Sequence, residues 1–105
     1  MTSLQGYITA TYQQLVEALG EPDYMEASGD GKVETEWEWY DEDHGPITIY
    51  DWKQFDGGAT SRSGQPYVWH IGGAKSAVVD VVDEMIDNVT VFNGAYWRAN
   101  NVRSL

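Results

Sequence analysis

The chain has 105 residues and a formal net charge of −11, from 17 acidic residues against 6 basic ones. This length predicts one domain with its own hydrophobic core, and the absence of cysteine excludes disulfides and thiolate metal sites. The negative charge disfavours direct binding to nucleic acid or to an anionic membrane, because both need patches of Lys and Arg. The sequence shows neither a run of about 18 apolar residues nor a leader-like N-terminus. We therefore expect a soluble protein that stays in the cytoplasm.

A β-prone segment, residues 4–10, opens the chain and predicts an edge strand. Thr11 and Gln14 then form a T-x-x-Q capping box, which predicts a helix over residues 12–19. Gly20 suits the residue that ends this helix. Its apolar side chains recur at helical spacing, so that its role is packing: Tyr12, Leu15, Val16 and Leu19.

The centre of the sequence holds three β-prone runs, KVETEWEWYD (32–41), ITIYDWK (47–53) and YVWHIGG (67–73), separated by turn-rich linkers. They predict a three-stranded antiparallel meander. The first run alternates strictly, which predicts one buried and one solvent-facing side. The side chains expected to point inward are Val33, Thr35, Trp37 and Trp39, and those expected to point outward are Glu34, Glu36, Glu38 and Tyr40.

A second helix is expected over residues 74–87, opened by Gly72-Gly73. Asn93-Gly94 is a strong tight-turn signal and predicts a hairpin from residues 89–92 and 95–97. The expected fold is α+β: a three-stranded antiparallel meander packed by two helices on one face, with a C-terminal hairpin or extension. Residues 1–88 are expected to form a single domain. Residues 89–105 are the extension, in part mobile, which packs on the domain or forms a homodimer with another copy.

The sequence shows no catalytic equipment. His44 lies in an acidic loop, and His70 lies in the middle of a predicted strand, where a hydrogen-bonded sheet residue is commoner than a base. Asp51 would need a cation or backbone donors if it is buried, and we interpret it as structural. The acids and histidine of residues 41–44 do not match a calcium-binding loop. We expect neither an enzyme nor a metal site nor a cofactor.

The acids of the first central strand define the preferred binding surface. Glu34, Glu36 and Glu38 recur every second residue, so an extended strand would project them on one side at intervals of about 6.6–6.8 Å. Acids steer a basic partner and aromatic side chains anchor it. The alternative is an ordinary solvated sheet face whose charges keep the domain soluble. The expected partner-binding residues are Glu34, Glu36, Glu38, Tyr40, Asp41, Glu42, Asp43, Tyr50 and Trp52.

A small-anion site is an alternative. Gly72-Gly73 precedes the second predicted helix, and exposed N–H groups at a helix N-terminus bind anions. Lys75 would add a positive charge there. The competing interpretation is that the two glycines only let the strand turn closely into the helix.

The segments LQGYITATYQQLVEALGEP, GDGKVETEWEW, ITIYDWK and YVWHIGG carry a resemblance to a known family. In this order they look like a family of small uncharacterised bacteriophage and prophage proteins with a TYxxLVxxxGEP…IYDWK…WHIGG pattern. The resemblance covers about residues 4–73, and the tail after Asp87 lies outside it. It implies a phage-related origin and residence in the cytoplasm of an infected bacterium, but no activity and no catalytic residue.

The sequence thus leads us to expect a non-enzymatic phage accessory protein that binds and inhibits or redirects a host protein. The partner is expected to be basic, and the spacing of the glutamates suggests mimicry of a nucleic-acid backbone. The alternative function is a binder of a small anion or nucleotide signal at Gly72, Gly73 and Lys75. A third is a structural or oligomeric phage component.

Overall fold

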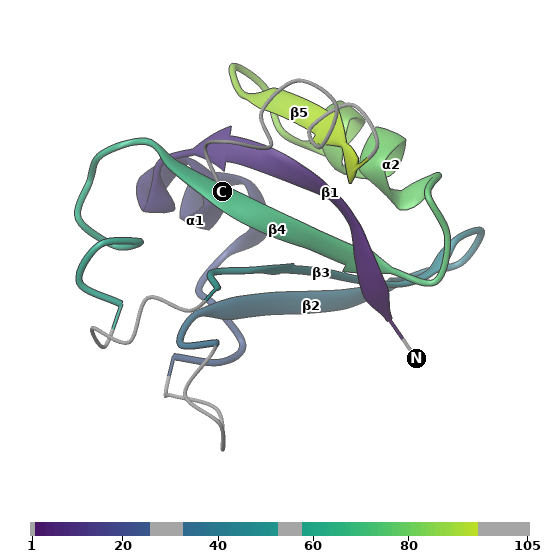
Figure 1. The fold of residues 1–105 in the computed structure, drawn as a ribbon, viewed down its shortest axis with the longest axis horizontal. Helices are drawn as coiled ribbons and strands as arrows, with labels where there is room; N and C mark the ends of the chain where they lie inside the picture. The colour runs from purple at the N-terminus through teal and green to yellow at the C-terminus, as the bar shows by residue number, and fades with distance from the viewer. Residues whose placement is uncertain (1, 26–32, 53–57, 95–105) are drawn as a thin grey trace.

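The computed structural model describes residues 2–25, 33–52 and 58–94. Within them it shows an α+β fold with one antiparallel sheet of five strands and two helices (Figure 1). The elements in chain order are β1 (Ser3–Ala10), α1 (Tyr12–Leu19), β2 (Glu36–Asp41), β3 (Gly45–Tyr50), β4 (Tyr67–Gly73), α2 (Val78–Met85) and β5 (Thr90–Asn93). The strand order across the sheet is β2-β3-β4-β1-β5.

The predicted meander is present as β2, β3 and β4, but the expected sheet of three strands is wrong because the sheet has five. β1 is not an edge strand, since it pairs with β4 on one side and β5 on the other. Tyr7 and Ile8 point to opposite sides of β1 and are only 3% and 0% exposed. Burial on both sides is typical of an interior strand.

The C-terminal segment contributes a strand of the same sheet. β5 is the first arm of the predicted hairpin, and it pairs with β1 from Gly6–Asn93 to Thr9–Thr90. The sheet therefore continues past residue 88. The second arm at residues 95–97, and the expected homodimer contact through the tail, lie outside the described residues.

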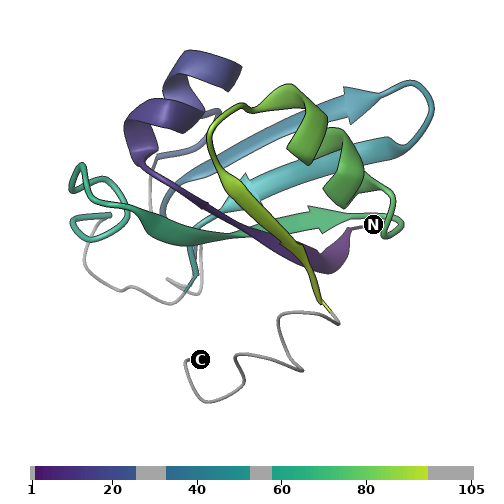
Figure 2. The ribbon, with the colours of Figure 1, turned by 90° about the horizontal axis from the view of Figure 1, so that it is seen from above.

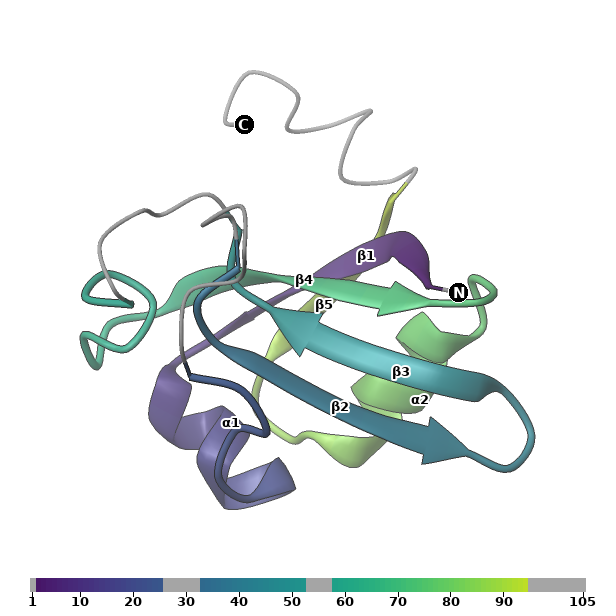
Figure 3. The ribbon, with the colours of Figure 1, turned by 90° about the horizontal axis from the view of Figure 1, so that it is seen from below.

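Helix α1 spans the predicted residues, and its capping box is formed. The Thr11 hydroxyl accepts from the Gln14 backbone N–H (3.1 Å), and the Gln14 side chain accepts from the Thr11 N–H (2.8 Å). α2 is shorter than the expected 74–87, because residues 74–77 form a turn and Ile86 is already extended. α2 lies in front of the sheet in Figure 2 and behind it in Figure 3.

Both helices bury their apolar sides in one core against a single face of the sheet. At its centre the rings of Trp37 and Trp69 meet edge to face, with centroids 5.4 Å apart. Each buried indole N–H finds a backbone acceptor, Gly20 O at 2.8 Å for Trp37 and Ala10 O at 3.0 Å for Trp69. These bonds fix both rings, because a buried donor without an acceptor costs free energy.

The outer edge of β2 is partly occupied by the chain that follows α1. Tyr24 exchanges both backbone hydrogen bonds with Glu36, at 2.8 and 3.1 Å. The Asp23 carboxylate accepts from the Glu38 N–H at 2.9 Å. Two backbone N–H groups of this edge strand are therefore satisfied within the chain.

Asp51, directly after β3, is 1% exposed and joins three segments of the chain. Its Oδ1 accepts from the backbone N–H groups of Glu34 (2.8 Å) and Thr35 (3.0 Å). Its Oδ2 accepts from the Ser61 hydroxyl at 2.8 Å. Backbone donors thus satisfy this buried carboxylate, as the structural interpretation of Asp51 required.

Replacing Asp51 by Ala should destabilise the fold, because two buried N–H groups and one buried hydroxyl lose their acceptor. Each such loss costs about 1–3 kcal/mol, so we expect the free energy of unfolding to fall by about 3 kcal/mol or more. Urea denaturation followed by tryptophan fluorescence measures it. Asp83→Ala, on the exposed side of α2, is the control and should change stability by no more than about 0.5 kcal/mol. A loss below about 1 kcal/mol for Asp51→Ala would contradict the assigned role.

Candidate binding groove on the open sheet face

The sheet face turned away from α1 and α2, here called the open face, carries a row of side chains that crosses all five strands. The pairing registers place these residues opposite one another on neighbouring strands. Directly opposed side chains on one face are in contact distance. The row runs, from β2 to β5, through Glu36, Tyr50, His70, Tyr7 and Phe92.

His70 is the centre of an aromatic cluster in this row. Tyr7 meets it edge-on at 5.1 Å, Tyr50 is tilted against it at 5.3 Å, and Trp52 stacks on it at 5.8 Å and 27°. Burial under these rings lowers the pKa of His70 to about 4, against a smaller opposing effect of the Asp51 charge. The imidazole is therefore neutral near pH 7 and serves as a support for the surrounding rings.

The neighbouring row contains a glycine. Thr48 of β3 lies opposite Gly72 of β4, and the Thr48 hydroxyl fills the space that a Gly72 Cβ would occupy. Thr48 lies beside the much larger Tyr50 on the same face of β3. A groove of about 600 Å³ lies over β2 and β3, and its lining includes Glu36, Glu38, Tyr40, Thr48, Tyr50 and Trp52.

Glu36 is the half-buried acid of the groove, and its pKa is raised from 4.5 to about 7. Burial is the main cause, followed by a hydrogen bond to the Glu38 side chain and by the negative charges of Glu38, Asp23 and Asp51. Tyr50, which faces it on β3, has a raised pKa through burial and through the Glu36 charge. The groove thus holds an acid that is protonated in part at neutral pH.

Five of the nine expected partner-binding residues, Glu36, Glu38, Tyr40, Tyr50 and Trp52, lie together in this groove. Glu34 does not, and the expectation that it projects outward is wrong, since it is 4% exposed. β2 begins at Glu36, so strand alternation does not extend back to Glu34. The bonds from the Glu34 and Thr35 N–H groups to Asp51 turn the backbone there. Glu34 Oε2 is buried without a hydrogen-bond partner in the described part of the chain.

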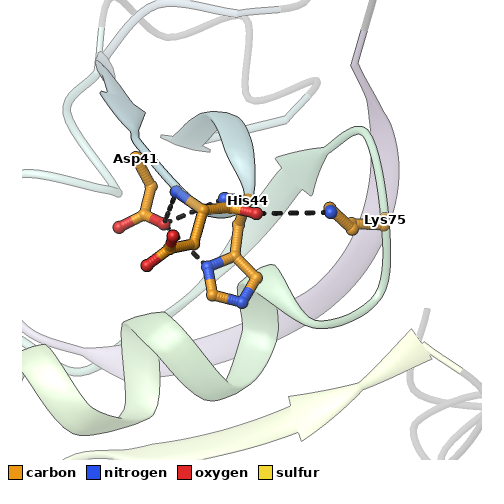
Figure 4. Close-up of polar contacts among 4 residues, drawn as sticks. Asp41, His44 and Lys75 are labelled. Atoms are coloured by element: carbon orange, nitrogen blue, oxygen red, sulfur yellow. Dashed lines mark hydrogen bonds and ion pairs between the residues drawn. The ribbon is translucent and has the colours of Figure 1, made fainter.

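The acids Asp41, Glu42 and Asp43 lie at the β2–β3 hairpin, where Figure 4 shows Asp41 beside His44. Asp41 Oδ2 accepts from the backbone N–H groups of Asp43 and His44 and lies 2.7 Å from His44 Nδ1. The bond with His44 is the main cause of the lowered pKa of Asp41. Asp41 therefore holds its own turn, and only Glu42 and Asp43 are exposed there.

The expected anion site does not form. Gly72 and Gly73 are buried inside β4, and α2 begins only at Val78. The Val78 side chain packs where a Gly73 Cβ would lie, as Thr48 does at Gly72. Lys75 is exposed and donates to the Asp43 backbone oxygen at 3.4 Å (Figure 4). The glycines thus serve close packing. The Lys75 side chain bonds to the β2–β3 hairpin and does not form an anion site with them in the described structure.

The contribution of His70, Tyr7, Thr48 and Gly72 to this face was not predicted from the sequence. Each looked ordinary in its own strand, and only the pairing registers bring them beside Glu36 and Tyr50. An aromatic ring lies in the middle of three β-prone runs, residues 4–10, 47–53 and 67–73. These rings, Tyr7, Tyr50 and His70, were the available signal for an aromatic row across the sheet.

No family model, no curated protein and no solved structure matches the chain. In the described ranges, no helix is long and apolar enough to cross a membrane. Nor does any group of three His, Cys, Asp or Glu in these ranges have the arrangement to hold a metal ion.

The buried neutral His70 makes stability depend on pH. The unfolded chain binds a proton at His70 below its ordinary pKa of 6.5, whereas the folded chain does so only below about 4. The unfolded state thus holds more protons between these values, so stability falls as pH falls from about 6.5 to about 4.

Replacing His70 by Phe keeps a ring and removes the titration. Urea unfolding at about pH 7 and about pH 4.5 should show a smaller acid-induced loss for the variant, the difference being at most about tenfold in the unfolding constant per pH unit. Identical pH dependence in the two proteins would show that His70 is not buried in neutral form.

Proposed function

We propose that this chain is a non-enzymatic binding protein that captures a basic partner protein in the groove of the open face. One observation carries the proposal: a single concave surface joins two carboxylates, Glu36 and Glu38, with three large aromatic side chains, Tyr40, Tyr50 and Trp52. Aromatic residues dominate the binding energy of protein interfaces. Carboxylates of a chain with net charge −11 accelerate the approach of a basic partner.

The charge of the groove is left without an internal counter-charge in the described part of the chain. No Lys, Arg or His in these ranges forms an ion pair with Glu36 or Glu38. Every charged neighbour that acts on Glu36 is negative. A cation from outside would relieve this repulsion, which favours a basic ligand over an acidic or neutral one.

A carboxyl of raised pKa is also common in active sites, so catalysis is the competing interpretation. The described groove lining contains no His, Lys or Ser to act as nucleophile or base. Ser61, beside Asp51, is fully buried. We therefore favour binding.

Because of the resemblance to phage proteins, the proposed partner is a host protein that the chain inhibits or redirects. Mimicry of a nucleic-acid backbone is no longer part of it. That idea needed three evenly spaced outward carboxylates, and Glu34 is buried.

The test is affinity capture of basic proteins from a bacterial lysate with the chain and a double variant, Glu36→Gln with Glu38→Gln. We expect the variant to lose the captured partner, and we expect rising salt to weaken capture by the parent chain. The control, Asp83→Asn with Glu84→Gln, removes the same charge from the exposed side of α2 and should retain the partner. Equal capture by both variants would refute the groove as the binding surface.

A further inference from the structure

Two aromatic walls form a corner in the groove. The rings of Tyr50 and Trp52 lie 6.2 Å apart at 72° to each other. Trp52 is held by its stack on His70, and Tyr50 is held by its contact with the same ring. This edge-to-face pair leaves ring surface in the groove that suits a flat or compact cation, because the face of an aromatic ring is electronegative.

A pair of carboxyl groups lies beside this corner. Glu36 is directly opposite Tyr50 across the β2–β3 ladder, and Glu38 is directly opposite Thr48. Burial and the nearby Glu38 side chain raise the pKa of Glu36 to about 7, so Glu36 is protonated in part in the free protein at neutral pH.

We propose that the groove takes one arginine side chain of the partner, with its guanidinium group between the Glu36 and Glu38 carboxylates and its flat face against the Tyr50–Trp52 corner. The inference rests on the proposed function and names the group that is recognised. Arginine fits better than lysine because its planar fork donates to two carboxylates at once and stacks on aromatic rings. Thr48, much smaller than Tyr50 on the same face, lines the groove that would receive the side chain.

The arginine takes the place of the proton on Glu36. Binding then releases that proton to solvent wherever the free protein holds it, that is, below about pH 7. The groups that act on Glu36 all oppose its ionisation: Glu38 on the same strand, Asp23 from the segment after α1, and Asp51 after β3. Tyr50, the neighbour on β3, is neutral at these pH values because its pKa is raised. Affinity should therefore rise with pH and level off above about 7.

The experiment uses three blocked peptides that differ at one position, which is arginine, lysine or the neutral isostere citrulline. Dissociation constants for the whole chain come from amide chemical shifts and tryptophan fluorescence at about pH 6 and about pH 8. We expect arginine to bind about tenfold or more tightly than lysine, and citrulline not to bind. Arginine affinity should fall about tenfold between pH 8 and pH 6.

Glu36→Gln should weaken arginine binding and remove its pH dependence. Glu84→Gln, an exposed acid of α2, is the control and should leave both unchanged. The amide spectrum of each variant reports whether it is folded. Trp52→Ala should weaken arginine binding without removing the pH dependence, since the glutamate pair remains.

Three results would overturn the inference: equal affinity for arginine and citrulline, unchanged arginine affinity between the two pH values, or no arginine binding up to about 10 mM. If lysine and arginine bind alike while the Glu36/Glu38 variant still loses the captured partner, the proposed function stands and the arginine preference fails. If that variant keeps its partner, both fail.

Discussion

The fold and the groove both depend on the buried carboxylate of Asp51. It is an acceptor surrounded by donors: two backbone N–H groups before β2 and the Ser61 hydroxyl before β4. Because a carboxylate can be removed from water only when its oxygens are hydrogen-bonded, the three segments must meet at this point. Asp51 precedes Trp52, and its backbone donors come just before Glu36. The same group therefore sets where both the aromatic and the acidic sides of the groove begin.

Burial acts in opposite directions on the pKa values of Glu36 and His70, two of the titratable groups of the open face. It favours the neutral form of each, so it raises the pKa of Glu36 to about 7 and lowers that of His70 to about 4. Between pH 4.5 and 7 the folded chain holds more protons at Glu36 than the unfolded chain does, so this group makes stability fall as pH rises. His70 does the reverse between about 4 and 6.5. The groove is thus less charged at neutral pH than its composition implies.

The elements whose signals lie within a few neighbouring residues were predicted from the sequence. The Thr11–Gln14 box and the helical spacing after it fixed α1, and alternation with turn signals located β2, β3 and β4. The partners of β1 and β5 were not predictable in this way, because those contacts join the two ends of the chain. Glu34 was misplaced because alternation was extended across residues whose backbone is held by Asp51. Of the groove, the sequence identified the acids and the outer aromatic residues but not the His70 support or the place of Thr48 in the lining.

The strand pairing of Tyr24 with Glu36 and the cover of Asp23 over the Glu38 N–H have a consequence for how partners are selected. An unguarded sheet edge accepts almost any extended peptide, since main-chain bonding ignores sequence. Here strand addition is blocked beside Glu36 and Glu38, because Tyr24 and Asp23 already bond to their outer backbone groups. At this edge, a partner of the kind proposed above would have to approach over the face, where the chemistry of individual side chains decides whether it stays.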